Sequence, residues 1–232
     1  MRGRTQPAHL SLDSETTPWC NLTVSGLPII DRRTRRRQET VDEIVTAAWE
    51  QVRERGLAGL SMRDLGARVG MRAQSLYSYF ASKHEIYDAM FLQGNEEFLE
   101  WMQDDAGTGA HADDRVAAVH RSARRFFDFC VSDPVRYQLL FQRTIPDFVP
   151  SERSYAVARA AYDTARDRLT AVGLDQSGVD LWTATMTGLV AQQLSNEPGG
   201  DRWSVLVDRS VDMLLAQLAP RQFKNVGPRR SK

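Results

Sequence analysis

Apolar residues recur every three or four positions along most of the chain, which is the spacing of a helix that buries one face. The first such run begins near Gln38 and ends at Gly56, with Thr40 and Glu43 as a capping pair at its start. Its apolar positions are Val41, Ile44, Val45, Ala48 and Val52. Nowhere do apolar and polar residues alternate as in a half-buried strand, so the pattern predicts an all-α fold.

Two short helices are expected next. Ser61 and Asp64 have the spacing of a helix cap, and Gly70 stops the helix that they begin. Gly66, in the middle of that helix, lets another helix approach closely. The third helix is expected over residues 72–80.

Ser82 caps a fourth helix, with Glu85 returning to it. Segments containing proline or glycine then separate the remaining apolar runs. The helices expected beyond this point cover residues 83–103, 112–131, 134–142, 151–172, 177–195 and 203–218.

This organisation predicts a small N-terminal domain of three helices, residues 31–88, followed by a larger helical bundle, residues 89–220. Residues 1–30 carry prolines, serines and threonines without sustained periodicity, and we expect them to form a disordered extension. Residues 221–232 are expected to be a tail.

The overall charge is balanced, with a formal net charge of +0, and 42% of the residues are hydrophobic, as in an ordinary globular protein. The balance hides a basic run, "DRRTRRR", immediately before the first periodic helix. It contains Arg32, Arg33, Arg35, Arg36 and Arg37. Such a run is either a solvated basic arm or an arm that contacts phosphates or the minor groove, and the sequence leaves both open.

The sequence gives no sign of a membrane segment. The apolar stretch over residues 21–30 is interrupted by Gly26 and Pro28, and it is shorter than the roughly 20 residues that span a bilayer. The N-terminus lacks the apolar core of a secretory signal, so we expect a cytoplasmic protein. Cys20 and Cys130 are far apart and form neither a disulfide framework nor a metal cluster.

The expected helix over residues 72–80 has two unlike faces. On a helical wheel Leu76 and Phe80 share the face toward the first two helices, with Ala73 at its border. The rest of the helix is polar, with Gln74, Ser75 and Ser78 opposite the core, Tyr77 and Tyr79 beside them, and Arg72 at the start. Glutamine pairs with adenine, arginine with guanine and serine with either kind of base edge, while tyrosine hydroxyls and Lys83 suit phosphates. This face has the chemistry that the major groove of DNA requires.

The segment "LSMRDLGARVGMRAQSLYSYFASKHEIYDAM" resembles the DNA-binding domain of the TetR family of bacterial transcriptional regulators. The resemblance covers about residues 38–90, and its motifs are Gly70-Met71, Leu76-Tyr77-Ser78-Tyr79-Phe80 and Ser82-Lys83. It implies a helix-turn-helix whose base edges are faced by Arg72, Ala73, Gln74 and Ser75. It implies phosphate contacts from Ser61, Arg63, Tyr77, Tyr79 and Lys83. Arg72 stands where the family often has serine or threonine, so neither the cap of this helix nor its base preference follows from the resemblance.

Some of these residues have a second interpretation from the sequence. Tyr77 and Tyr79 also suit partial packing against the first and fourth helices. The starts of the second and fourth helices, at Ser61 and Ser82, are candidates for backbone N–H groups aimed at phosphates.

For the second domain, the resemblance implies a homodimer through the helices near 177–195 and 203–218, and a pocket for a small-molecule effector. Independently, the last helix has an apolar stripe wider than one packing partner requires. Its residues are Val207, Val211, Leu214 and Leu218, with Leu206 and Leu215 beside them. Either a symmetric partner, with Trp182, Met186 and Leu189 joining the seam, or packing within the chain accounts for this stripe.

Aromatic residues gather on the middle helices, and a cavity among them would take an apolar ligand. They are Phe126, Phe127, Phe129, Tyr137, Phe141, Tyr155 and Tyr162. Core packing is the other interpretation, and the sequence identifies neither the pocket residues nor the effector.

Two other classes of protein compete with a DNA-binding regulator. An all-α enzyme would need a catalytic motif, and the chain has no HExxH pair, P-loop, dinucleotide fingerprint or nucleophile elbow. We therefore expect no enzyme, no cofactor and no metal. A helical protein-interaction adaptor leaves Arg72, Gln74 and the arginine run without a role. The sequence favours a homodimeric repressor that binds a palindromic double-stranded DNA operator and is released by an effector.

Overall fold

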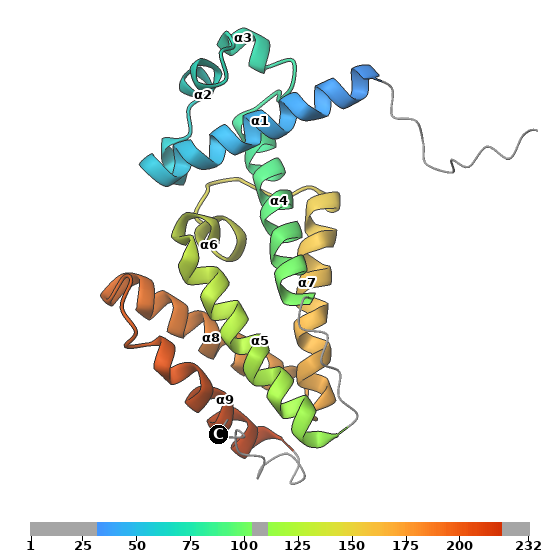
Figure 1. Cartoon of the computed structure of the whole chain (residues 1–232), viewed down its shortest axis with the longest axis vertical. Helices are drawn as coiled ribbons and strands as arrows, with labels where there is room; N and C mark the ends of the chain where they lie inside the picture. Colours follow the sequence, from blue (N-terminus) through green and yellow to red (C-terminus); the bar gives the residue numbers. More distant parts are fainter. Residues whose placement is uncertain (1–31, 104–110, 220–232) are drawn as a thin grey trace, which may run out of the picture. The chain divides into compact units, whose positions relative to one another are not determined.

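The computed structural model describes residues 32–103 and 111–219, and every regular element in those ranges is a helix (Figure 1). The expected all-α fold is confirmed, and none of the described helices is long and apolar enough to cross a bilayer. The extension expected over residues 1–30 and the tail over 221–232 lie outside the described residues. The helices are α1 Arg32–Arg55, α2 Met62–Arg68, α3 Ala73–Leu76, α4 Lys83–Gln103, α5 Ala112–Ser132, α6 Pro134–Phe141, α7 Glu152–Ala171, α8 Gln176–Asn196 and α9 Val207–Leu218, with 3-10 turns η1 Leu57–Gly59 and η2 Ser204–Leu206.

Helix α1 begins earlier than its apolar pattern predicts. It starts at Arg32, so Thr40 and Glu43 lie inside the helix and do not cap it. Arginine and glutamine are good helix formers, and they extend the helix through a stretch that has no apolar periodicity. The basic run is therefore helical, and its residues are exposed. The segment up to Gln38 belongs to a separate compact unit, and the second unit begins at Glu39.

The link between α2 and α3 depends on two glycines. Gly70 has φ 66°, a conformation that L side chains rarely adopt. A Cβ on Gly66 would lie 3.0 Å from the Met71 carbonyl oxygen and 3.3 Å from the Ala73 amide nitrogen. The predicted close approach at Gly66 is confirmed.

Helix α3 is shorter than expected, since it ends at Leu76 and not near Phe80. The chain continues in hydrogen-bonded turns, in which the Phe80 N–H donates to the Leu76 carbonyl oxygen at 3.1 Å. The Ser78 hydroxyl donates to the Ser75 carbonyl oxygen at 2.7 Å, and such local bonds compete with regular helix.

The caps of α2 and α4 follow their sequence signals. The Ser61 hydroxyl oxygen accepts from the Asp64 N–H, and the Ser82 hydroxyl oxygen accepts from the Glu85 N–H at 3.2 Å. The Glu85 carboxylate accepts from the Ala81 N–H at 2.7 Å, one residue before the position that a capping box predicts.

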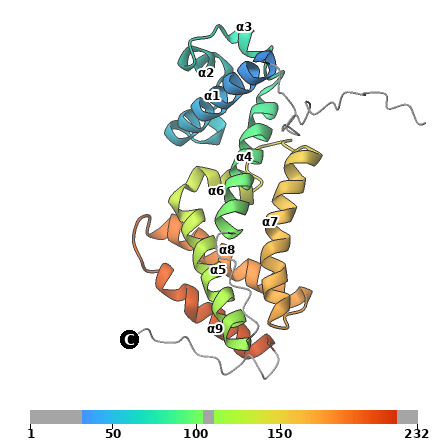
Figure 2. The ribbon, with the colours of Figure 1, turned by 45° about the vertical axis from the view of Figure 1, so that its right-hand side comes forward.

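Two hydrophobic cores hold the unit that begins at Glu39. The first core joins α1, α2, α3 and the start of α4, and residues after α5 also pack against it, namely Leu139, Ile145 and Phe148. The second core joins the end of α4 with α5, α7, α8 and α9. Helix α4 contributes residues to both cores and so links the two cores. Helix α7 lies alongside α4 (Figures 1 and 2).

The apolar stripe of the last helix is buried within the chain. Helices α5 and α8 both pack against α9, and residues of all three helices share the second core. The buried residues are Val207, Val211, Leu214 and Leu215 on α9, and Trp182, Met186 and Leu189 on α8. Of the two interpretations of the stripe, packing within the chain therefore accounts for these residues, and Leu218 is the exposed residue of the stripe.

Polar contacts also attach α9 to α5. His120 lies between two carboxylates, with Nδ1 3.0 Å from Asp208 Oδ1 and Nε2 3.1 Å from Asp212 Oδ1. Arg124 Nε donates to Asp208 at 2.8 Å. Burial alone would raise the pKa of Asp208, but the hydrogen bonds from Arg124 and His120 outweigh it and lower the pKa.

Candidate nucleic-acid interface

The core of the N-terminal helices fixes the orientation of α3. Leu65 of α2 and Leu76 of α3 have no exposed surface, and Phe80 is 6% exposed. All three belong to the first core. With one side of α3 anchored in this way, its remaining side chains are directed away from the core.

The exposed side of α3 is the polar side predicted from the wheel. Arg72, Gln74 and Ser75 are exposed, and Ala73 is half-buried at the border. No side chain caps the helix at Arg72. Within residues 32–103 and 111–219, neither the Gln74 nor the Arg72 side chain has a hydrogen bond or ion pair. These donors and acceptors are therefore available to a partner.

The two tyrosines of the motif differ. Tyr77 is 52% exposed, so packing does not occupy its ring. Tyr79 is half-buried and packs against the first core, which is the second interpretation considered for it. Its role in packing does not exclude a contact by its hydroxyl.

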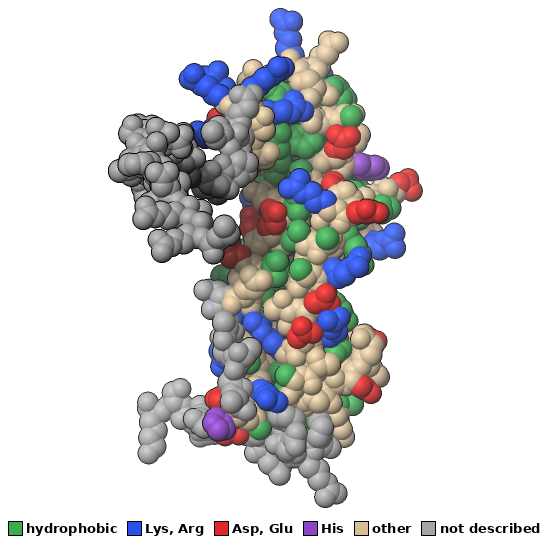
Figure 3. Space-filling view, turned by 90° about the vertical axis from the view of Figure 1, so that its right-hand side faces the viewer, with side chains coloured by type: hydrophobic (Ala, Val, Ile, Leu, Met, Phe, Trp, Pro, Cys, Tyr) green, Lys and Arg blue, Asp and Glu red, His purple; other side chains and the backbone are tan. Residues whose placement is uncertain are grey.

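Three exposed cations flank the polar side of α3 in the sequence. None of these cations has an acidic partner among the described residues. They are Arg63 on α2, Arg72 directly before α3, and Lys83 at the start of α4. Other arginines nearby are neutralised, since Arg55 pairs with Asp64 at 2.7 Å and Arg68 pairs with Glu54. On the face that carries α7, acidic and basic side chains are mixed over the described surface (Figure 3).

The helix starts offer fewer free backbone donors than expected. The Ser61 N–H donates to Gln51 Oε1 at 3.1 Å, and the Ser61 hydroxyl oxygen already accepts from Asp64. At the start of α4, the Ala81 N–H already donates to the Glu85 carboxylate. At these two helix starts, side chains are better placed than the backbone to contact phosphates.

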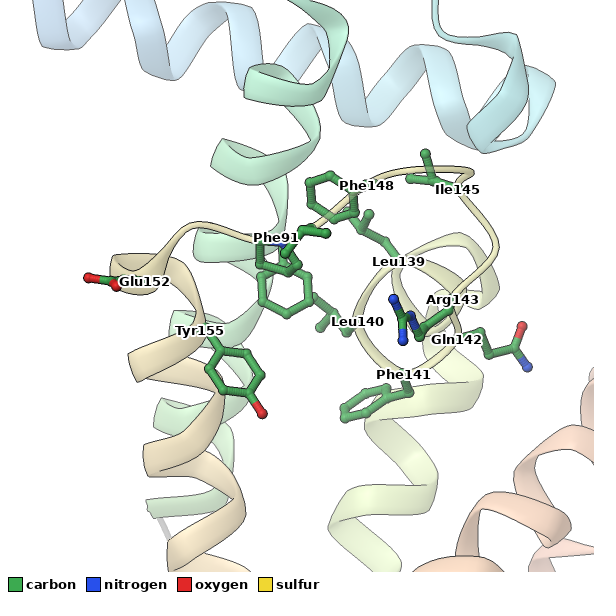
Figure 4. Close-up of a pocket in the computed structure, with 12 residues that line it drawn as sticks. Phe91, Leu139, Leu140, Phe141, Gln142, Arg143, Ile145, Phe148, Glu152 and Tyr155 are labelled. Atoms are coloured by element: carbon green, nitrogen blue, oxygen red, sulfur yellow. The ribbon is translucent and has the colours of Figure 1, made fainter.

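Two cavities lie among the later helices. The outer cavity has a volume of about 510 Å³ and is lined by α4, α6, the start of α7 and the segment between α6 and α7 (Figure 4). The central cavity has a volume of about 310 Å³ and is lined by α4, α5, α7 and α8. Both volumes fall in or near the range of about 300–1,000 Å³ that small-molecule sites occupy.

The cavities divide the aromatic residues of the middle helices. Phe126, Phe141, Tyr155 and Tyr162 line the central cavity. Phe127, Phe129 and Tyr137 are buried in the second core and line neither cavity. Sequence reasoning missed other lining residues, namely Phe91, Phe98, Trp182, Arg143 and Arg159. Helical spacing shows that a residue faces inward, but it does not show whether a void lies there.

Comparison with known proteins supports what the geometry indicates. A family model described as "Bacterial regulatory proteins, tetR family" matches residues 44–90, which contain α2, α3 and the turn between them. Residues 44–90 thus match the DNA-binding domain of the TetR family. The matched segment contains the helix-turn-helix, and the relatives below are named transcriptional regulators.

Two mycobacterial proteins are similar to this chain. It is 25% identical over 146 residues to the HTH-type transcriptional regulator Rv1816 of Mycobacterium tuberculosis, and the match spans 61% of this chain and 61% of the length of Rv1816. It is 26% identical over 189 residues to the HTH-type transcriptional activator FasR of Mycolicibacterium smegmatis, covering 81% of this chain and 82% of FasR.

Among solved structures, the transcriptional regulator FadR from Bacillus subtilis, in complex with stearoyl-CoA, has the same fold. The TM-score is 0.60 at 19% sequence identity, and the match covers 76% of this chain and 98% of FadR.

Proposed function

We propose that this chain is a transcriptional regulator of the TetR family that binds a palindromic operator as a homodimer and is released by a small-molecule effector. The observation that carries the proposal is the exposed polar side of α3, which buried Leu76 and Phe80 hold in place. A regulator of this kind acts on the chromosome, in the cytoplasm.

The proposed base contacts come from the first residues of α3. The Arg72 guanidinium carries two donors that match the guanine edge in the major groove. The Gln74 amide carries a donor and an acceptor that match the adenine edge. Ser75 suits either kind of edge, and Ala73 suits the thymine methyl group. Arg72 and Gln74 have no competing partner among the described residues.

The proposed phosphate contacts surround these base contacts. Lys83 and Arg63 supply charge, and Tyr77 supplies a hydroxyl from an exposed ring. Tyr79 and Ser61 take part through hydroxyls whose positions are fixed by packing and by the α2 cap.

The proposed dimer uses the outer faces of α8 and α9. Leu181 is 48% exposed and Met213 is 57% exposed. Ala184 and Gly188 continue the exposed face of α8 at helical spacing, and their small side chains allow a second helix to approach. Two-fold symmetry would place two α3 helices in major grooves about 34–36 Å apart, or a multiple of that.

The proposed effector occupies the cavities of the later helices. It acts by binding preferentially to a state in which the α3 helices are wrongly spaced for the operator, which lowers DNA affinity. The stearoyl-CoA bound by FadR supports an apolar chain as the kind of ligand that this fold accommodates. Release by an effector corresponds to a repressor, although FasR is named an activator.

The experiment is fluorescence anisotropy of the full chain on a labelled fragment from upstream of its own gene and on a shuffled fragment, at several salt concentrations. We expect salt-dependent binding that prefers the upstream fragment by about 10³-fold or more. If the operator does not lie upstream of the protein's own gene, selection from random DNA identifies it. Weak, equal binding to all sequences in both experiments would contradict the proposal.

A further inference from the structure

The outer and central cavities share a wall. Four residues line both of them, namely Phe91, Leu140, Phe141 and Tyr155. Figure 4 shows Tyr155 directed toward the side of the cavity where Phe141 lies. The two cavities are therefore adjacent, and one elongated ligand can extend from one to the other where these shared side chains make room.

The central cavity suits the apolar part of a ligand. The polar side chains Asn95, Thr183 and Thr187 each donate to a carbonyl oxygen of their own helix, at 2.8, 2.9 and 2.7 Å. Most of the remaining wall is aromatic or aliphatic. The indole N–H of Trp182 is buried there without an acceptor among the described residues, and the fluorescence of this indole can report a ligand in the cavity.

The outer cavity adds a free cation to this apolar site. Arg143 is exposed, and it has no hydrogen bond or ion pair in the described part of the chain. In Figure 4 its guanidinium turns toward the interior of the cavity, whereas the Glu152 carboxylate turns away from it. In the central cavity, Arg159 lies over the ring of Tyr155, with its guanidinium carbon 5.1 Å from the ring centroid. Arg159 also has no ion pair in the described part of the chain, but it lines the central cavity, so Arg143 is the cation of the outer, solvent-facing cavity.

We infer that the joined cavities bind an amphipathic anion. Its anionic head pairs with Arg143, and its aliphatic chain runs past Phe141 and Tyr155 into the central cavity. A guanidinium binds a carboxylate or a phosphate through two parallel hydrogen bonds, which favours a charged head over a neutral one. The inference deepens the proposed effector site, and it rests on the proposed function only for its effect on DNA.

The first test measures the affinity of the full chain for decanoate and 1-decanol by calorimetry without DNA. We expect wild type to prefer decanoate by about tenfold or more, and Arg143→Gln to remove this preference while still binding 1-decanol. Arg153→Gln is the matched control, because Arg153 is an exposed arginine at the start of α7 that lines neither cavity. Equal affinities in wild type, no binding of either ligand, or a preference that survives Arg143→Gln would overturn the inference.

The second test locates the chain of the ligand. Bromine quenches tryptophan fluorescence on contact, so 11-bromoundecanoate should quench the wild-type protein. Trp182→Phe should remove most of this quenching, because the brominated end lies in the central cavity. Full quenching of the Trp182→Phe variant would place the chain elsewhere and contradict the inference.

Two further measurements are needed. One distinguishes the chemical groups that could supply the anionic head, and the other distinguishes a failure of the ligand inference from a failure of the proposed function. Decanoyl-CoA replaces decanoate, and tighter binding of either one identifies the coenzyme A phosphates or a free carboxylate as the anionic head. If a ligand binds through Arg143 but operator affinity is unchanged, the inference stands and the proposed effector response fails. If neither ligand binds while operator binding is intact, the inference fails and the DNA-binding proposal stands.

Discussion

Gln74 and Lys83 are both exposed polar residues near the start of a helix, but we assign them different roles. Gln74 lies on the exposed side of α3, where an amide reads a base edge, and Lys83 begins α4, where an ammonium group neutralises a phosphate. Gln74→Ala should cost about 1–3 kcal/mol at one base pair of each half-site and leave binding to random DNA unchanged.

Lys83→Ala should instead weaken binding to all sequences alike and reduce the salt dependence by about one counterion. Anisotropy titrations on operator and random DNA at several salt concentrations measure both effects. Gln138→Ala, which removes an exposed glutamine on α6, is the control for the first variant. Identical losses for Gln74→Ala and Lys83→Ala on both DNAs would refute the division into base and phosphate contacts.

Asp208 connects α9 to α5, and it gives a prediction about pH. Its lowered pKa means that the carboxylate stabilises the fold above the ordinary aspartate pKa of about 3.9, and that this stabilisation is lost as the pH falls through the lowered pKa. Asp208→Asn should cost about 1 kcal/mol at pH 7, because solvent screens a side chain that is 35% exposed.

The difference in unfolding free energy between wild type and Asp208→Asn should shrink below about pH 4. Urea titrations between pH 7 and pH 2 measure it. A difference that stays constant down to pH 2 would show that the ion pair does not carry the stabilisation.

At the scale of single residues, the sequence predicts what local spacing determines. The Ser61 cap and the burial of Leu76 and Phe80 follow from positions within one or two turns of helix. Arg143 was not predicted, because its importance depends on an absent ion-pair partner among the described residues and on a cavity formed by residues far apart in the chain.

The turn between α2 and α3 is the element that sets the DNA-binding face, and it tolerates little change. A methyl group on Gly66 meets backbone atoms of Met71 and Ala73, which cannot move without displacing α3. Gly66→Ala should destabilise the fold by about 1–3 kcal/mol and weaken operator binding.

Ala67 provides the matched site for this prediction, because it is the next residue on α2 and is exposed. Ala67→Val should cost less than about 0.7 kcal/mol, which is the range of helix propensity alone. Urea denaturation compares the two variants. Equal costs would show that the close approach at Gly66 is not what limits this position.

At the scale of elements, the order of helices in the described ranges was predictable, and some ends and faces were not. Helix α1 begins early because arginines favour helix without showing apolar periodicity, and α3 ends early because Ser78 bonds locally. The sequence left the partner of the stripe on α9 open, since it does not reveal that α5 and α8 pack against it.

The assembly of the whole molecule depends on the outer faces of α8 and α9. If these faces form the dimer, Leu181→Glu or Met213→Glu should bury a charge in the interface and shift the protein to monomers. Val149→Glu is the control, because Val149 is 74% exposed and lies between α6 and α7.

Analytical ultracentrifugation at several concentrations measures this shift. Dimers that persist in both variants would exclude these faces as the interface. Monomers in the wild-type protein at micromolar concentration would contradict the proposed homodimer itself.

Contacts within the unit that begins at Glu39 also connect the cavities to the DNA-binding helices. Phe148 lines the outer cavity, and its ring centroid lies 5.9 Å from that of Tyr87 on α4. The Tyr87 hydroxyl donates to the Leu57 carbonyl oxygen at 2.5 Å, just before α2. We expect Phe148→Ala to reduce the change in operator affinity that saturating decanoate causes, as measured by anisotropy. Calorimetry gives the saturating concentration for the variant, because Phe148 also lines the outer cavity.

The central claim is that the exposed side of α3 reads DNA sequence, and selection from a random duplex library tests it most directly. The wild-type chain should enrich a two-fold symmetric site with half-sites about one helical turn apart, or a multiple of that. Gln74→Ala should enrich the same site with the preference lost at one base pair per half-site. No enrichment by the wild-type chain, or an unchanged preference in Gln74→Ala, would contradict the claim.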